Sequence, residues 1–278
     1  MASSVAGVIE PALQAAESAR SASRPTNDLT AYDLYLRALA VYFPISKDRL
    51  YKALGLLEQA LSIDPHYGLA LSWAAYCHYS VVRDGWAEEP EFSRHRAIEL
   101  ARRALEVGEN DPHVLAHAAF VLAYLGEDAE AMMGLIDRGL ALNPSFARGW
   151  FLSGHLRVFA GQPDVAIEHV ETSLRLSPRE RVGTSLGAIG LARFIKREFD
   201  AALSKLIPAI QDDPGFPSPY RVLAACYAHM GRLDEARAIV AKLRAITSQV
   251  MPSDLPWRNP EDRELYLSGL RLAAGELE

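Results

Sequence analysis

Cysteine and long apolar runs are both scarce in this sequence. Only Cys77 and Cys226 occur among 278 residues. Two cysteines are too few for the disulfide framework of a small secreted domain, so we expect a reducing, cytoplasmic environment in which both are small buried side chains. No run of about 20 apolar residues is present, which excludes a transmembrane helix and predicts no membrane association. The N-terminal region also lacks the basic and apolar stretches of a secretory signal peptide.

Positive charge is also low. The chain has 29 lysine and arginine residues against 35 aspartate and glutamate residues, and the basic ones are scattered along it. A protein that binds nucleic acid needs a concentrated basic face, so we expect no nucleic-acid binding by this region. The sequence has no phosphate-binding G-x-x-x-x-G-K-[ST] loop, no dinucleotide fingerprint and no H-E-x-x-H metal motif. We therefore expect no cofactor and no metal.

Two sets of residues raise the question of catalysis. Gly183, Ser185 and Gly187 match the G-x-S-x-G motif of serine hydrolases, in which the serine stands on a turn between a strand and a helix. Here the motif falls inside a predicted helix, which disfavours a hydrolase that uses Ser185. His113 and His117 have a spacing that can share a metal ion, but no carboxylate or cysteine accompanies them at helical spacing. The chain by itself is predicted not to be an enzyme.

The sequence is rich in helical hairpins, and residues 147–178 contain the most regular one. Two helices are predicted there, over residues 148–160 and 164–176. Gly161 lies between them, where the end of a helix favours a residue that can adopt positive φ. Small residues recur where the helices must approach closely: Gly154, Ala166 and Ser173. This pattern resembles a tetratricopeptide repeat (TPR), a helix-turn-helix unit of about 34 residues.

The same pattern recurs along most of the chain. Prolines near the ends of successive hairpins are separated by 47, 32, 34 and 36 residues; they are Pro65, Pro112, Pro144, Pro178 and Pro214. An insertion between the two helices of the second pair, residues 83–92, accounts for most of the long interval. We predict an all-α fold, a right-handed TPR-like solenoid of six helix pairs over residues 30–248.

The regions outside the repeats have their own organisation. Residues 4–29 are predicted to form an extra amphipathic helix and a linker. Residues 249–276 are predicted to form an extended tail and a capping helix that starts at Asn259 and Pro260, because the last repeat has no neighbour to cover it. Residues 1–3 and 277–278 look like vector-derived ends, so we expect the chain to be a fragment of a longer protein.

The first helices of TPR pairs line a concave face, and projection of the repeats places aromatic and basic residues there. Such a groove suits a protein or peptide partner. The N-terminal helix or a second copy of the chain, in a homodimer, would fit equally well, and helical spacing alone leaves open whether these side chains are core instead. The predicted groove residues are Tyr32, Tyr35, Tyr76, Tyr79, His113, Phe120, Tyr124, Arg148, Phe151, His155, Phe159 and Arg221.

A wider resemblance rests on five segments. Residues 31–38, AYDLYLRA, resemble the start of the C-terminal repeat region of bacterial class III adenylate/guanylate cyclases with TPRs. Residues 9–13, 85–86, 259–262 and 266–271 match the same family. The resemblance implies a regulatory or interaction region whose catalytic domain is absent from this chain. A segment similar to 31–38 also occurs in winged-helix transcriptional regulators, so a TPR sensor region of such a regulator is the alternative.

Overall fold

The computed structural model describes residues 30–178, 182–252 and 255–276, and these contain helices but no strand. The predicted N-terminal helix therefore lies outside the described residues. The helices are α2 (Ala31–Tyr42), α3 (Lys47–Ile63), α4 (Gly68–Asp84), α5 (Pro90–Val107), α6 (Pro112–Tyr124), α7 (Ala129–Leu142), α8 (Ala147–Phe159), α9 (Pro163–Leu176), α10 (Val182–Ile195), α11 (Phe199–Asp212), α12 (Pro217–His229), α13 (Leu233–Arg244) and α14 (Pro260–Ala274).

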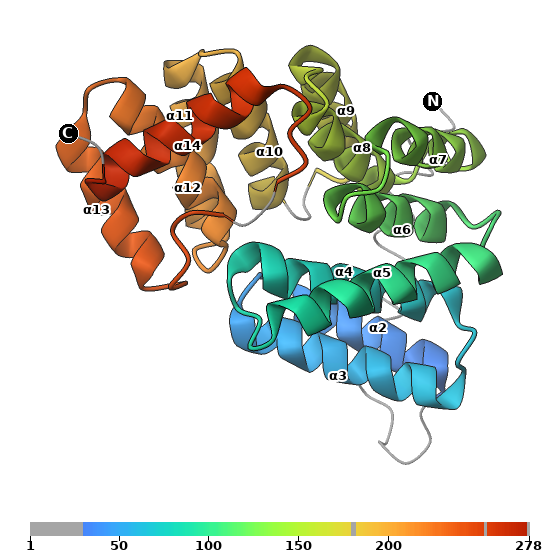
Figure 1. Cartoon of the computed structure of the whole chain (residues 1–278). Coiled ribbons are helices and arrows are strands. Elements are labelled where there is room, and N and C mark those ends of the chain that lie inside the picture. The colour runs from blue at the N-terminus through green and yellow to red at the C-terminus, as the bar shows by residue number, and fades with distance from the viewer. Residues whose placement is uncertain (1–29, 179–181, 253–254, 277–278) are drawn as a thin grey trace.

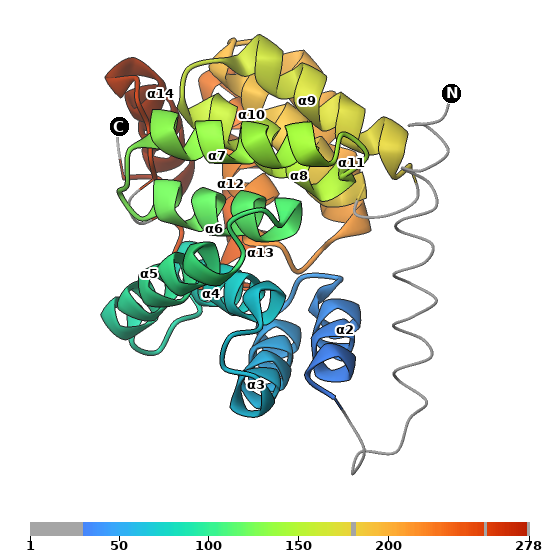
Figure 2. The same cartoon turned by 90° about the vertical axis from the view of Figure 1, so that its right-hand side faces the viewer.

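Helices α2–α13 form six consecutive pairs, and each pair packs on the next. The first helices of successive pairs, from α4 to α12, also contact one another and make an inner layer, while the second helices lie outside it (Figures 1 and 2). The predicted all-α solenoid of helix pairs is confirmed.

Local signals explain where the helices begin and end. Thr30 caps α2: its hydroxyl accepts a hydrogen bond from the Asp33 amide, and the Asp33 carboxylate accepts one from the Thr30 amide, each at 3.2 Å. Asp111 accepts from the amides of His113 and Val114 at the start of α6. Gly161 has φ of 76° between α8 and α9, as its position between the predicted helices requires.

The hairpin of α8 and α9 is held at close range by Gly154. A Cβ atom at this position would lie 2.7 Å from the carbonyl oxygen of Ala166 and 2.6 Å from Cγ2 of Val170. The prediction that small residues permit a close approach of these helices is therefore confirmed at Gly154.

The predicted insertion at residues 83–92 is not a long loop. Helix α4 continues to Asp84 and α5 begins at Pro90, so α4 has 17 residues and α5 has 18, against 13 and 14 in the fourth pair. Most of the extra residues lengthen the two helices. The longer hairpin brings Trp86 to the sixth pair, where its indole N–H donates to the carbonyl oxygen of Ile246 at 3.1 Å.

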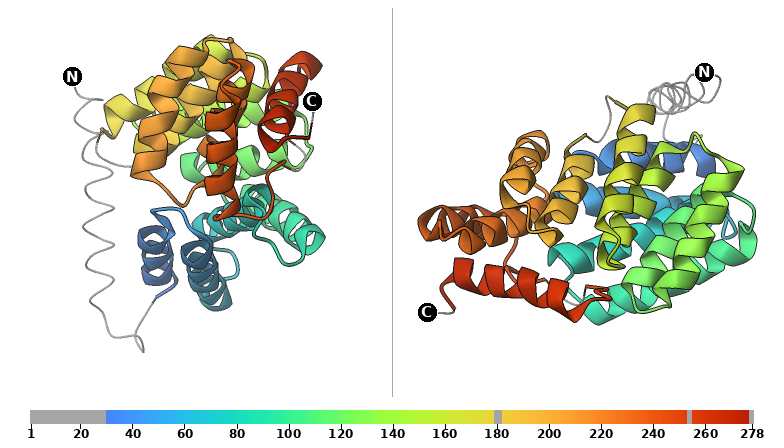
Figure 3. Two further views of the ribbon diagram at one scale, coloured as in Figure 1. Left: turned by 90° about the vertical axis from the view of Figure 1, so that its left-hand side faces the viewer. Right: turned by 90° about the horizontal axis from the view of Figure 1, so that it is seen from above.

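The array curls until its two ends meet. The Ile45 amide, after α2, donates to both carboxylate oxygens of Asp213, after α11, at 3.1 and 3.2 Å. The Arg83 guanidinium lies 5.0 Å from the ring centre of Phe216. Contacts between the first two pairs and the last two therefore close the concave side. Figure 3 shows the course of the chain from two further directions.

The carboxylate of Asp213, which takes part in the contact that closes the array, predicts a pH dependence of stability. Burial raises the pKa of Asp213 to about 6, and nearby Asp212 and Asp84 add to the effect. The pKa of an unfolded aspartate is about 3.9. Between about pH 4 and pH 6 the folded state therefore holds more protons than the unfolded state, so the free energy of unfolding falls as pH rises.

We expect Asp213→Asn to exceed the wild type in free energy of unfolding by about 1 kcal/mol at pH 4.5 and by roughly 2–3 kcal/mol at pH 7.5. The amide oxygen can still accept from Ile45, and Asn143 already occupies the matching position after α7. Urea unfolding at the two pH values is the measurement. An advantage of equal size at both would show that ionisation of Asp213 is not its cause.

Helix α14 covers the last pair, mainly through α12, with further contacts to α13 and α10. Nε2 of His229 is 2.7 Å from the carbonyl oxygen of Leu265, and Gly269 leaves room for the close crossing over Ala225. Because α14 lies on the first helices of the last two pairs, the chain before it must cross the inner face. No helix among the described residues is long and apolar enough to span a membrane.

Candidate functional site

The predicted groove residues are placed mostly inside the protein. Tyr32 is 42% exposed and His113 is half-buried, while the other ten are at most 9% exposed. The ten are Tyr35, Tyr76, Tyr79, Phe120, Tyr124, Arg148, Phe151, His155, Phe159 and Arg221. Their role in binding a peptide stays a prediction, and in this arrangement a partner would first have to uncover them.

The inner face of α4, α6 and α8 is filled largely by its own rings. The ring of Phe120, 1% exposed, lies 5.9 Å from that of Tyr76, 5.7 Å from that of Tyr79 and 5.8 Å from that of His155. Aromatic pairs at such distances stabilise the fold beyond the area that they bury. These side chains therefore belong to the core of the inner layer.

The C-terminal tail, residues 249–252 and 255–258, occupies part of the same face. Arg221 of α12 is 1% exposed and donates to the carbonyl oxygens of Gln249 at 2.7 Å and Val250 at 3.1 Å. Farther along, the ring of Trp257 packs 4.5 Å from that of Phe159. The Arg258 amide donates to the carbonyl oxygen of Phe159 at 2.9 Å.

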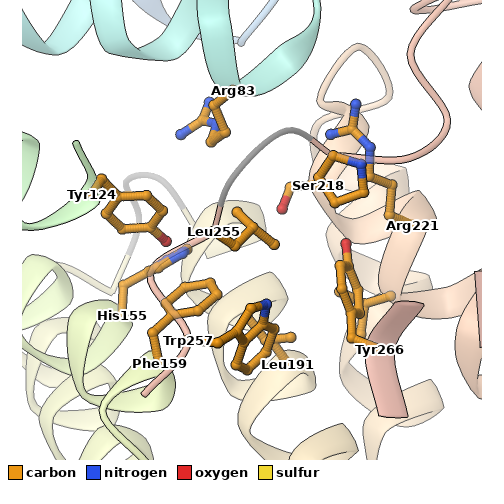
Figure 4. Close-up of a pocket in the computed structure, with 12 residues that line it drawn as sticks. Arg83, Tyr124, His155, Phe159, Leu191, Ser218, Arg221, Leu255, Trp257 and Tyr266 are labelled. Carbon is orange, nitrogen blue, oxygen red and sulfur yellow. The ribbon is translucent and has the colours of Figure 1, made fainter. Parts of the chain in front are cut away.

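Between the tail and the inner helices a small cavity remains. Its volume of about 20 Å³ suffices for about one water molecule. In Figure 4 the side chains of α4, α6, α8 and α12 surround this space, and Leu255 of the tail lies among them. The residues that line it are Arg83, Tyr124, His155, Phe159, Leu191, Ser218, Arg221, Val222, Pro252, Leu255, Trp257 and Tyr266. A peptide can reach this space only if the tail moves.

Sequence reasoning identified the inner-face residues and missed the tail. The tail was expected to be extended, and that expectation carried no information about where it lies. A usable signal was Trp257, a large apolar side chain in a proline-rich segment. Such a side chain is rarely left fully exposed.

Arg148 and Arg221 are buried on the inner face and the side chain of Arg83 is nearly so, and of these three only Arg83 pairs with a carboxylate in the part of the chain that the structure describes. Arg83 donates to both oxygens of Asp84, at 2.9 and 2.6 Å. Arg221 binds neutral carbonyl groups. Arg148 lies among aromatic rings, 4.7 Å from the ring centre of Phe151 and 5.0 Å from that of Tyr76. Counted over the described residues, the inner face therefore carries more positive than negative charge.

The arginines of the inner face affect the pKa values of neighbouring side chains. Burial, with Arg83 and Arg148 nearby, lowers the pKa of His155 to about 3, so its ring is neutral at pH 7. Burial tends to raise the pKa of Tyr76, but Arg148 and Arg83 outweigh burial and lower it. The shift of the Tyr76 pKa reports a positive potential in this region, whereas the shift of the His155 pKa is caused mainly by burial.

The structure also places the other residues that the sequence suggested for catalysis or metal binding. Ser185 lies inside helix α10 and is 4% exposed, which is not the strand-to-helix turn that a nucleophilic serine requires. Nδ1 of His117 is 2.9 Å from the carbonyl oxygen of His113. Within the described ranges no group of three or more histidine, cysteine, aspartate or glutamate residues could hold a metal ion. Cys77 and Cys226 are both unpaired and buried, which confirms the prediction that they are small buried side chains.

Comparison with known proteins supports the repeat fold. Residues 194–250 match the sequence profile of the tetratricopeptide repeat family. No curated protein sequence matches the chain. Among solved structures, the human IFIT1 dimer with m7Gppp-AAAA is similar at a TM-score of 0.62 and 19% identity, over 77% of this chain and 50% of that one.

Two further solved structures are also similar in fold to this chain. The APC/C hetero-tetramer Cut9-Hcn1 has a TM-score of 0.57 and 15% identity over 87% of this chain and 43% of that chain. PilW, a type IV pilus biogenesis factor, has a TM-score of 0.52 and 15% identity over 77% of this chain and 92% of its own. The chain spans about half the length, or less, of the first two. These findings and the helix pairs together show that the described residues form a tetratricopeptide-repeat solenoid.

Proposed function

We propose that this chain is a protein-interaction region without catalysis of its own, and that its tail occupies the site where a partner peptide binds. The observation that carries the proposal is the way the tail is held: Arg221 binds two of its carbonyl groups, and Trp257 packs against the inner layer. Main-chain hydrogen bonds combined with an anchored aromatic side chain are a common way of binding an extended peptide.

The tail is held by local contacts, so a partner peptide can take its place. Its described polar contacts to the inner helices include the two bonds from Arg221 and the bond from the Arg258 amide to Phe159. The tail is joined to α13 on one side and α14 on the other, so its effective concentration at the site is high. A partner must therefore either bind more tightly or arrive when the tail is released.

The test uses a peptide with the sequence of residues 249–258, labelled with a fluorophore. We expect it to bind a variant whose own residues 249–258 are replaced by a glycine-serine linker of equal length. Binding to the wild type should be at least about tenfold weaker, because the tethered tail competes at high effective concentration. Fluorescence anisotropy measures both affinities.

A peptide with alanine in place of Trp257 serves as the control and should bind the linker variant more weakly. Circular dichroism must show that the linker variant keeps its helices. If it does, and the peptide still fails to bind, the tail occupies no peptide site. If the linker variant unfolds, Trp257→Ala in the full chain offers a milder release of the tail for the same titration.

We also propose a place for this region in a larger protein. The resemblance of residues 31–38, 259–262 and 266–271 to class III nucleotide cyclases supports a regulatory C-terminal region of such an enzyme, active in the cytoplasm, that holds a partner or a second copy. The unpaired cysteines support a reducing compartment. Deletion of residues 30–273 from the full-length protein should change cyclase activity or its regulation. A DNA-binding domain upstream of this region would instead favour a transcriptional regulator.

A further inference from the structure

Arg148 has unused hydrogen-bonding capacity inside the protein. Its residue is 7% exposed, and neither Nε nor Nη2 has a hydrogen-bond partner among the described residues. No ion pair joins it to a carboxylate in the described part of the chain, and its guanidinium carbon lies 4.7–6.0 Å from the ring centres of four aromatic side chains: Phe43, Trp73, Tyr76 and Phe151. A buried cation without a counter-ion is costly, and buried polar atoms nearly always have a partner.

A neighbouring group on the same helix shares this property. His155 follows Arg148 by seven residues, two turns along α8, is 9% exposed, and has no partner for Nδ1. The His155 ring lines the small cavity behind the tail (Figure 4). The face of α8 that looks inward thus presents two buried polar groups that the described protein does not satisfy.

The described charged residues around this face leave room for one further negative charge. The inner layer buries Arg83, Arg148 and Arg221, whereas the carboxylates buried near them are Asp84 and Asp213. Within the described ranges, three positive charges against two negative ones leave one in excess at neutral pH. A monoanion would balance it and a dianion such as sulfate would exceed it.

We propose that Arg148 binds a small monocarboxylate anion on the inner face of α8, within the cage formed by Phe43, Trp73, Tyr76 and Phe151. The planar guanidinium fork suits a carboxylate, which can accept from Nε and Nη2 side by side. The site does not depend on the peptide-binding function, because a small anion needs no displacement of the whole tail.

The experiment follows thermal and urea unfolding of the full chain in sodium formate, with sodium gluconate replacing it at constant ionic strength. Formate is the smallest carboxylate, and gluconate is too bulky for the cage. We expect the wild-type midpoint to rise by several degrees as formate replaces gluconate, and the midpoint of Arg148→Met to stay unchanged. In gluconate alone, Arg148→Met should be at least as stable as the wild type, because a buried unpaired charge has been removed.

A purely structural role for Arg148 gives a different pattern. The variant would then be less stable than the wild type by the same amount in both salts, and the proposal would be overturned. Tyr76 offers another counter-ion: if its hydroxyl is ionised at pH 7, tyrosinate absorbance appears in the wild type, disappears in Arg148→Met, and formate has no effect. That result would also overturn the proposal.

A direct measurement covers the case in which Arg148→Met does not fold. Carbon-13 formate should show line broadening in the presence of wild-type protein, and the broadening should weaken in Arg148→Lys, which keeps the charge but loses the fork. Equal broadening in the two proteins, or none in the wild type, would show that the guanidinium of Arg148 binds no carboxylate. Because the tail peptide is absent from this assay, its failure leaves the peptide proposal to be judged by its own titration.

Discussion

Replacement of Phe120, Tyr124 and Phe151 together by alanine is expected to unfold the protein at 25 °C. These side chains are 1%, 5% and 6% exposed and come from two neighbouring helices of the inner layer. Removal of one buried aromatic ring costs about 3–5 kcal/mol, so three cost roughly 9–15 kcal/mol, as much as the whole stability of a typical domain. Circular dichroism should show loss of helix and of the cooperative thermal transition.

The single variant Phe120→Ala gives the same test within a measurable range. It should lower the free energy of unfolding by about 3–5 kcal/mol. Phe92→Ala is the matched control: Phe92 lies at the start of α5 and is 61% exposed, so its loss should cost less than about 1 kcal/mol. A triple variant that keeps a cooperative transition would mean that the inner face is open in solution, as a permanently accessible groove requires.

Gly154→Ala is expected to be the most damaging single-methyl change in the fourth pair. The added Cβ would lie 2.7 Å from the carbonyl oxygen of Ala166, a backbone atom that cannot rotate away. Helices α8 and α9 would have to separate, and we expect a loss of about 2–3 kcal/mol in the free energy of unfolding.

Gly134→Ala is the control for the same chemical change. Gly134 lies in α7, is exposed, and would place its Cβ with nothing within 4 Å. Alanine has the higher helix propensity, so this variant should gain up to about 1 kcal/mol. Urea unfolding of the two variants beside the wild type should give changes of opposite sign. Changes of equal sign and size would show that the close approach of α8 and α9 is not maintained in solution.

Much of the secondary structure was predictable because its signals are local. Thr30 before α2, Asp111 and Pro112 at α6, and Asn259 and Pro260 at α14 start their helices through side-chain hydrogen bonds or fixed φ angles. Gly161 ends α8 because it alone tolerates positive φ there without strain. The one local error, at residues 83–92, arose because a break in the repeat spacing does not say whether extra residues form a loop or longer helices.

The candidate site depended on information that local signals do not hold. Helical spacing correctly grouped Tyr76, Phe120 and His155 on one face. It could not tell whether that face meets solvent, a partner or the protein itself, because Tyr, Phe and His occur in all three settings. Arg221 binds Gln249 and Val250, which are 28 and 29 positions away along the chain. These two residues belong to the tail, whose sequence has no periodicity that could predict the contact.

The amino-acid sequence by itself determined that this protein is a stack of helix pairs, since each pair is specified by residues within about 34 positions of one another. Only the tertiary structure decided that the stack closes on itself. The contacts that close it join Ile45 to Asp213 and Trp86 to Ile246, 168 and 160 residues apart, and they depend on the small rotation accumulated over successive pairs. That closure buries Arg148 without a carboxylate and brings the tail across the inner face.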